Sequence, residues 1–152
     1  MNFFSLFKRN IIYKFKKKIL IDLDKVEEKS LDKLFQFYGS DKGNFFEAGN
    51  TRGHGYSDFY VSQLNNLKDN KINILEIGSY AGGSAAAFAK YFSKANIFCL
   101  DINLRNFISR ANRPTSIHIY FNIYFFYILY KHDILFFNLN TIIIYMLNIL
   151  YA

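Results

Sequence analysis

Two short segments of this sequence combine residue types that can bind a cofactor. Residues 74–84 read Ile-Leu-Glu-Ile-Gly-Ser-Tyr-Ala-Gly-Gly-Ser, and Leu100-Asp101-Ile102 follows one helix length later. In a strand–helix–strand unit, a glycine turn after the first strand and an acid after the second lie around one crevice, beside the N-terminus of the helix. The spacing therefore predicts a binding site for a cofactor that contains adenosine.

Each part of this pattern has an expected role. The glycines allow a tight turn and a close approach of ligand and helix to the backbone. Free N–H groups at the start of the helix favour an anionic group. Glu76 is placed to face an ammonium group, and Asp101 to accept hydrogen bonds from ribose hydroxyls. The candidate cofactor-binding residues are Glu76, Gly78, Ser79, Tyr80, Gly82, Gly83 and Asp101.

The glycine spacing separates two cofactor classes. The sequence has Glu-x-Gly-x-x-x-Gly-Gly, whereas the dinucleotide fingerprint is Gly-x-Gly-x-x-Gly, and position 80 is Tyr where that fingerprint has its second glycine. This difference favours S-adenosylmethionine over NAD. An NAD-linked enzyme is a weaker alternative, and a plain strand-to-helix connection without a ligand is another.

The residues 34–107 resemble the N-terminal part of class I S-adenosylmethionine-dependent methyltransferases, and among them the macrolide-sugar (demethylmacrocin and mycinamicin type) O-methyltransferases. The resemblance is carried by Leu75 to Ser84, by Cys99-Leu100-Asp101-Ile102, and upstream by Tyr38-Gly39-Ser40-Asp41-Lys42-Gly43 with His54-Gly55-Tyr56. It implies O-methylation of a small-molecule or sugar acceptor. Asp41, Lys42, His54 and Tyr56 match the upstream signature, so they are candidate pocket residues.

The resemblance ends soon after Asp101. Intact relatives continue with an acidic Mg²⁺ site and a general base, but the only acid downstream in this chain is Asp133 and the only histidines are His118 and His132. We expect no metal ligands and assign no catalytic residue. The sequence is interpreted as a truncated copy that is inactive in methyl transfer.

The expected architecture is α/β: an incomplete Rossmann-like methyltransferase fold with one clear strand–helix–strand unit, preceded by helices and followed by an irregular apolar tail. The first strand is near-continuously apolar, as in a parallel strand covered on both faces. We expect helices over 3–21, 24–37, 57–66 and 84–92, strands over 71–77 and 96–102, and a glycine-rich loop over 38–56.

Positive charge gathers at the start of the chain. The net charge is +7, and six basic residues without an acid lie in the first eighteen: Lys8, Arg9, Lys14, Lys16, Lys17 and Lys18. Residues 1–33 are read as a basic helical region whose charges form a solvated face or contact an anionic membrane surface. Nucleic-acid binding is not expected, because the basic groups do not recur along the strand–helix–strand unit.

The single cysteine, Cys99, excludes a disulfide framework and fits a reducing compartment, so we expect a cytoplasmic protein, with membrane-surface contact as the open alternative. Cys99 lies inside an apolar run and is predicted to be a small buried hydrophobe. The three histidines have no metal-ligand spacing with it, so a zinc site is not expected.

Residues 108–152 form a low-complexity apolar tail. Of the 36 residues from 117 to 152, 29 are Ile, Tyr, Phe, Leu or Asn. The preferred interpretation is translation out of frame of an AT-rich gene. The alternatives are membrane segments over 117–130 and 134–151, or short strands such as Thr141 to Leu147. A membrane-associated binding protein, anchored by the basic start and this tail, is the alternative function.

Overall fold

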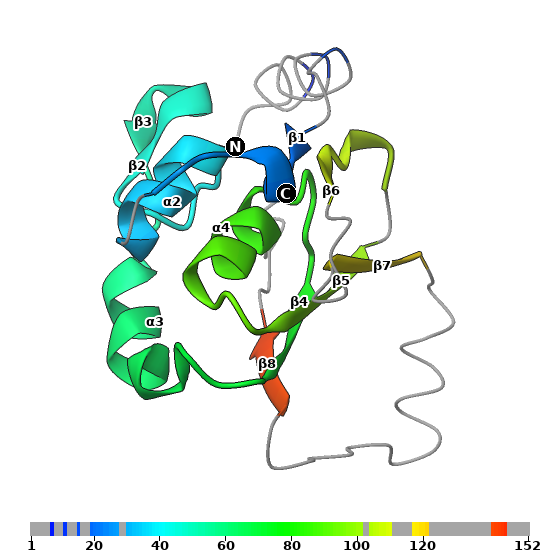
Figure 1. Cartoon of the computed structure of the whole chain (residues 1–152). Coiled ribbons are helices and arrows are strands. Elements are labelled where there is room, and N and C mark those ends of the chain that lie inside the picture. Colours follow the sequence, from blue (N-terminus) through cyan, green and yellow to red (C-terminus); the bar gives the residue numbers. More distant parts are fainter. Residues whose placement is uncertain are drawn as a thin grey trace.

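A four-stranded parallel sheet forms the centre of the protein (Figure 1). The computed structural model describes residues 7, 11, 15, 19–27, 30–101, 104–110, 117–121 and 141–145. All neighbouring strand pairs of this sheet are parallel. In spatial order the strands are β7 (Ile117–Phe121), β5 (Asn96–Asp101), β4 (Asn73–Ile77) and β8 (Thr141–Tyr145). The fold is therefore mixed α/β, as expected.

The predicted strand–helix–strand unit is present. Helix α4 (Gly83–Tyr91) connects β4 to β5, and the two strands pair from Asn73 opposite Asn96 to Ile77 opposite Leu100. The expected ranges 71–77 and 84–92 are each displaced from the observed bounds by no more than two residues. Three consecutive alanines, 85–87, are fully buried on α4. Their small side chains let the helix axis lie close to the elements around it.

Strand β4 is not covered equally on its two faces, which corrects one expectation. Ile74 and Glu76 are fully buried, whereas Leu75 and Ile77, on the opposite face, are only half-buried. Successive side chains of a strand point to opposite faces. The deeply buried face is thus the one that carries Glu76.

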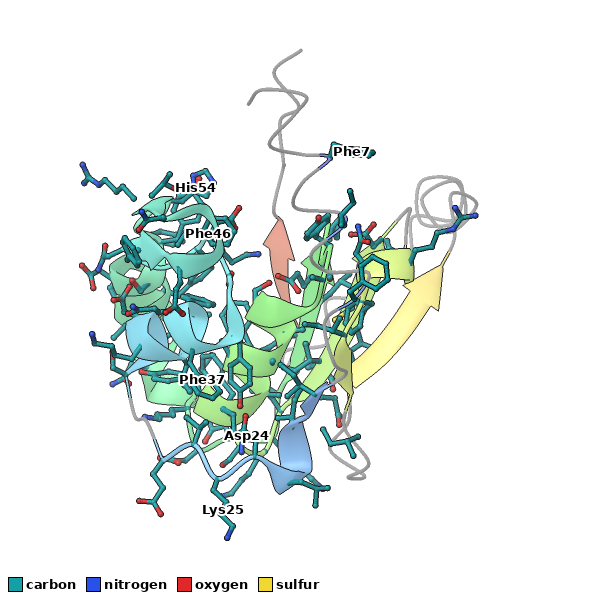
Figure 2. The ribbon with its side chains drawn as sticks, turned by 90° about the horizontal axis from the view of Figure 1, so that it is seen from above. Phe7, Asp24, Lys25, Phe37, Phe46 and His54 are labelled. Atoms are coloured by element: carbon teal, nitrogen blue, oxygen red, sulfur yellow. The ribbon has the colours of Figure 1, made fainter. Side chains whose placement is uncertain are left out.

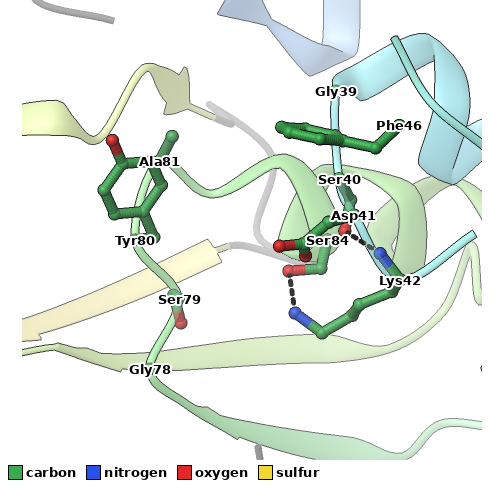
Figure 3. A pocket seen from close by; sticks show the side chains of 10 residues that line it. All are labelled: Gly39, Ser40, Asp41, Lys42, Phe46, Gly78, Ser79, Tyr80, Ala81 and Ser84. Atoms are coloured by element: carbon green, nitrogen blue, oxygen red, sulfur yellow. Dashed lines mark hydrogen bonds between the residues drawn. The ribbon is translucent and has the colours of Figure 1, made fainter. Parts of the chain in front are cut away.

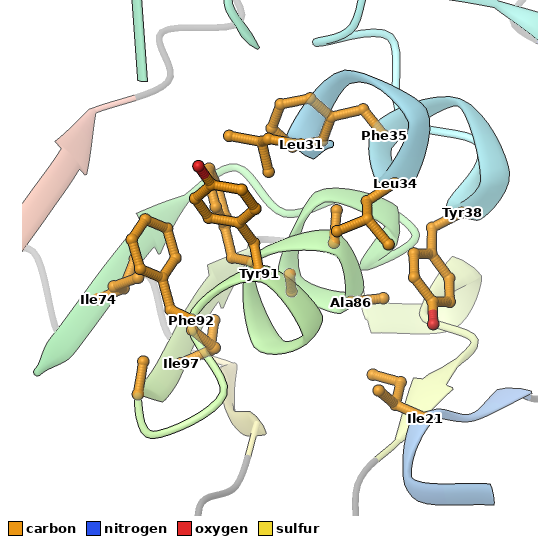
Figure 4. Packing of buried hydrophobic residues seen from close by; sticks show 14 of the residues in the cluster. Ile21, Leu31, Leu34, Phe35, Tyr38, Ile74, Ala86, Tyr91, Phe92 and Ile97 are labelled. Atoms are coloured by element: carbon orange, nitrogen blue, oxygen red, sulfur yellow. The ribbon is translucent and has the colours of Figure 1, made fainter. Parts of the chain in front are cut away.

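Helix α2 (Leu31–Tyr38) packs on α4 and completes the core (Figure 4). Its buried side chains recur every three or four residues, which places them on one face of the helix. They are Leu31, Leu34, Phe35 and Tyr38. Phe35 meets Phe88 of α4 edge to face, with ring centroids 5.4 Å apart. Helix α3 (Ser57–Leu64) adds Tyr60, whose ring also contacts Phe88 at 5.3 Å.

The start of the chain differs from the expected helix over 3–21. Phe7, Ile11 and Phe15 are helical, but Ile19–Leu20 is a strand, β1, which pairs in parallel with β6 (Ser109–Arg110), and a short 3-10 helix follows. The other residues of the expected helix, including all six basic ones, lie outside the described residues. The pairing partner is ninety residues away in sequence, so no local pattern indicates this strand.

The expected helix over 24–37 begins only at Leu31. The backbone of Asp24 is extended, with φ −79° and ψ 120°. In this conformation Asp24 accepts hydrogen bonds from two other helices. Its carboxylate accepts a hydrogen bond from the Tyr38 hydroxyl at 3.0 Å, and its backbone carbonyl accepts one from Lys90 Nζ at 2.5 Å. These tertiary contacts outweigh the helical spacing of the apolar residues.

The expected loop over 38–56 contains a small antiparallel hairpin. Strands β2 (Phe45–Phe46) and β3 (Thr51–Arg52) pair across a 3-10 turn, and Asn50 adopts a left-handed φ of 47°. Two-residue strands leave no periodic signal, so the sequence reading as a loop is wrong here. After it, α3 ends at Leu64 and a 3-10 helix, Asn65–Leu67, replaces the last turn of the helix expected over 57–66.

The apolar tail is not irregular throughout. Its described residues after 110 form β7 and β8, which add to the two sides of the β4–β5 pair. Of the alternatives for the tail, short strands match these residues, since β8 falls within the segment 141–147 named for that alternative. Among the helices of the described residues, none has the length and apolar character needed to cross a membrane.

Phe88 provides a test of the core. We expect Phe88→Ala to lower the free energy of unfolding by about 3–5 kcal/mol, because it removes a fully buried ring that contacts three others. Phe59→Ala is the matched control, since Phe59 is 63% exposed on α3 and its loss should change stability by no more than about 0.5 kcal/mol. Urea unfolding of both variants measures the difference, and equal losses would contradict the assigned core.

Cys99 is fully buried on β5, as predicted. Burial, with the nearby Glu76 carboxylate acting in the same direction, holds the pKa of its thiol well above the usual value. The folded state therefore favours the neutral thiol, and its contribution to stability is present at neutral pH and is lost as the pH rises above about 8.5, where the unfolded thiol ionises.

At pH 8 we expect a disulfide reagent to label Cys99 on the order of a hundredfold more slowly in the native protein than in urea, because labelling requires opening of the sheet. Equal rates in the two conditions would show that the thiol is accessible and the strand is not part of a packed sheet.

Candidate functional site

The end of helix α2 brings Lys42 to the site. Gly39 adopts a left-handed φ of 72°, its N–H donates to the Gln36 carbonyl at 3.1 Å, and the Ser40 N–H donates to the Phe35 carbonyl at 2.8 Å. These two bonds form a Schellman motif, which ends a helix and reverses the chain. The chain then passes directly beside the start of α4, where the Lys42 side chain is buried.

Three polar side chains from three elements meet there. Lys42 Nζ lies 2.9 Å from Glu76 Oε1 and donates to Ser84 Oγ at 2.9 Å. The Ser84 hydroxyl in turn donates to Glu76 Oε1. Glu76 is fully buried, and burying a charge is costly unless an opposite charge and hydrogen bonds accompany it. Lys42 supplies that opposite charge.

The second oxygen of this carboxylate, Glu76 Oε2, is buried and has no hydrogen-bond partner among the described residues. Leaving a buried acceptor unsatisfied costs about 1–3 kcal/mol. The negative charge of Glu76 also acts on Tyr60. Burial is the main cause that raises the pKa of the Tyr60 hydroxyl, the Glu76 carboxylate is the second, and Tyr56 adds to the effect. A donor group of a ligand would satisfy the free oxygen.

The turn between β4 and α4 is held in left-handed backbone conformations, with φ of 84° at Gly78, 48° at Tyr80 and 78° at Gly82. Its Tyr80 N–H donates to Asp101 Oδ2 at 2.6 Å. The acid at the end of β5 therefore lies against the turn at the end of β4. This is the juxtaposition that the spacing of the two segments predicts.

The two glycines at the start of α4 serve close packing. A Cβ on Gly82 would stand 2.5 Å from the Phe107 ring, and one on Gly83 would stand 2.7 Å from the Tyr38 carbonyl oxygen. The sequence indicated close packing at both positions. The partners are the segment after β5 and the loop after α2.

A pocket opens between the loop after α2 and the turn (Figure 3). The cavity itself is small, about 30 Å³, and the space between its walls reaches about 360 Å³ only when the open solvent at its mouth is included. Both the loop and the turn contribute polar side chains to its lining, and the Phe46 ring lies on the side of the loop. The lining residues are Gly39, Ser40, Asp41, Lys42, Phe46, Gly78, Ser79, Tyr80, Ala81 and Ser84.

Of the predicted site residues, Asp41, Lys42, Gly78, Ser79 and Tyr80 line this pocket. The other predicted residues do not line it. Glu76 lies behind Lys42 and Ser84, Asp101 lies beside the turn, and Gly82 and Gly83 lie in the packing below it.

The upstream signature is divided: Asp41 and Lys42 line the pocket, whereas His54 and Tyr56 form an exposed feature. The chain 41–44 pairs with 53–56 through backbone hydrogen bonds, and the Asp32 carboxylate secures it by accepting bonds from the Asn44 N–H and the Ser57 hydroxyl. The His54 ring stacks on Tyr56 with centroids 5.3 Å apart, and His54 Nε2 is 3.8 Å from Asp41 Oδ2. His54 and Tyr56 are exposed and do not line the pocket.

Sequence reasoning missed Ser84 and Phe46 as site residues. Ser84 was noted only as the start of a helix, yet its hydroxyl joins Lys42 to Glu76. A polar residue in the first turn after a strand-end acid is the signal that indicates it. Phe46 is brought to the pocket by the hairpin, which the sequence did not indicate. The described residues contain no group of three His, Cys, Asp or Glu side chains suited to a metal ion.

The Lys42–Glu76 contact can be tested by a double-mutant cycle. We expect Lys42→Met to lower the free energy of unfolding by about 3–5 kcal/mol, because it leaves a buried carboxylate unpaired. Lys42→Met combined with Glu76→Gln should cost less than the sum of the single changes, by about 1–3 kcal/mol.

Asp41→Asn is the control for that cycle, since Asp41 is half-exposed and adjacent to Lys42 in sequence; its stability should change by no more than about 0.5 kcal/mol. Thermal or urea unfolding gives the four values, and additive costs for the two single variants would refute a direct contact.

Comparison with known proteins does not assign this chain to a family. No protein-family model matches the chain, and no curated protein matches it. The assignment of a ligand therefore depends on the pocket, the buried Lys42–Glu76 contact and the position of Asp101.

Proposed function

We propose that residues 34–107 form a Rossmann-like cofactor-binding unit for S-adenosylmethionine, and that the chain belongs with methyltransferases acting on an oxygen of a small-molecule or sugar acceptor. The observation that carries the proposal is the Asp101 carboxylate, 2.6 Å from the Tyr80 N–H at the carboxyl ends of two parallel strands. A carboxylate at this place can accept hydrogen bonds from both hydroxyls of a ribose.

The Tyr80 side chain favours this cofactor over a dinucleotide. It lines the pocket at the position where the dinucleotide fingerprint has a glycine. That glycine lets a pyrophosphate approach the backbone closely. A phenol ring at this point narrows the space for a pyrophosphate, whereas the Asp101 carboxylate beside the turn suits the ribose of a nucleoside.

The opposite end of the pocket suits an amino acid. Lys42 and Ser84 line it next to the N-terminus of α4, and the Lys42 ammonium, which has three N–H donors, is the donor for a ligand carboxylate. Glu76 Oε2, behind these two side chains, is a buried acceptor without a hydrogen-bond partner among the described residues, and it adds negative charge near the place where a ligand ammonium would lie. S-adenosylmethionine carries a ribose at one end and an amino acid at the other, which matches this division of the pocket.

When bound, S-adenosylmethionine supplies an electrophilic methyl group. The residues of this chain would orient it: Asp101 would hold the ribose, and the Lys42–Glu76–Ser84 cluster would hold the amino acid. Such positioning supplies much of the rate in transfer reactions. The proposal assigns no metal and no general base to the described residues.

Calorimetric titration tests the proposal. The full chain is expected to bind S-adenosylmethionine and S-adenosylhomocysteine, and to bind NAD more weakly or not at all. Asp101→Asn should weaken both by about 10- to 100-fold, because the amide oxygen still accepts the Tyr80 N–H but the charge-assisted bond to the ribose is lost.

Asp58→Asn is the matched control, since Asp58 is an exposed acid on α3 and its replacement should leave the affinity unchanged. Binding of NAD without binding of either adenosyl ligand would overturn the assignment, as would equal affinities for the parent and Asp101→Asn.

A further inference from the structure

Three large apolar side chains near the start of the chain are exposed on one helical face. Phe7, Ile11 and Phe15 are helical and are 58%, 42% and 81% exposed. Residues four positions apart lie one above the other on an α-helix. Figure 2 shows the labelled Phe7 side chain standing clear of the packed side chains of the body. An apolar stripe of this kind is costly in water and calls for a partner.

The basic residues around this stripe indicate that the partner is negatively charged. Six lysine and arginine residues lie between positions 8 and 18, and no acid precedes Asp22. A helix with aromatic and aliphatic residues among lysines binds in the interface of a membrane, where the apolar side chains enter the acyl boundary and the cations meet anionic headgroups.

We propose that this N-terminal segment, residues 1–18, attaches the protein to an anionic lipid surface. A second copy of the chain is a poorer partner, because two segments with six positive charges each repel one another. A nucleic acid offers phosphates for the lysines but no apolar medium for the phenylalanines. A lipid surface satisfies both the exposed stripe and the charge.

The fold also connects this segment to the pocket. The Ile19 N–H donates to the Ile108 carbonyl at 2.9 Å, and the Ile108 N–H donates to the carbonyl of Ala81 at 3.1 Å. Ala81 lines the pocket. Two backbone hydrogen bonds thus join Ile19, which directly follows the attached segment, to the turn that lines the pocket.

Flotation of the full chain with lipid vesicles tests this attachment. We expect binding to vesicles that contain roughly one-third phosphatidylserine in phosphatidylcholine, and little binding to phosphatidylcholine alone. Salt at about 0.5 M should weaken the binding, because it screens the attraction between lysines and headgroups. The triple variant Phe7→Ser, Ile11→Ser, Phe15→Ser should bind at least about tenfold more weakly.

Phe59→Ser is the matched control, because Phe59 is as exposed as Phe7 but lies on α3; its binding should equal that of the parent. Equal binding to both vesicle types overturns the proposal. Unchanged binding of the triple variant also overturns it, since attachment would then come from another part of the chain. Competition by duplex DNA as effective as that by anionic vesicles would identify a general polyanion site and refute lipid attachment.

Discussion

The buried contact between Lys42 and Glu76 governs how the elements around it are arranged. A carboxylate removed from water at the end of β4 must have a counter-charge, and the only cation that reaches it among the described residues comes from the loop after α2. That loop can approach only because Gly83 has no side chain to meet the Tyr38 carbonyl. One charge pair and one glycine therefore hold α2, β4 and the start of α4 together.

The same approach gives the pocket two chemically different ends. On one side, Lys42 of the loop after α2 and Ser84 of α4 meet the half-satisfied carboxylate of Glu76. On the other side, the turn with its left-handed residues forms the wall, and its Tyr80 N–H donates to the Asp101 carboxylate beside it. Under the proposed function, the amino acid of S-adenosylmethionine would lie on the first side and its ribose on the second.

The sequence predicts the parts of this arrangement that are local. Apolar runs ending in Glu76 and Asp101 indicated β4 and β5, and the alanines indicated α4, because burial and helical spacing act over a few residues. It could not predict that Lys42 would pair with Glu76, since only the Schellman turn at the end of α2 brings that side chain back. The hairpin and the strand β1 were missed for a related reason: each has two-residue strands with no period to detect.

In the tail, the hydrophobic pattern of the sequence does not indicate which strand pairing forms. Thr141–Tyr145 reads Thr-Ile-Ile-Ile-Tyr, without polar alternation, yet it pairs with β4 in register from Asn73 to Ile77. Backbone hydrogen bonds do not depend on side-chain type. The outer edges of the β4–β5 pair can therefore pair with an extended segment that is rich in β-branched residues. All residues that line the pocket lie between 39 and 84. The proposed site is thus built by segments that precede the tail, whatever the origin of the strands that flank the β4–β5 pair.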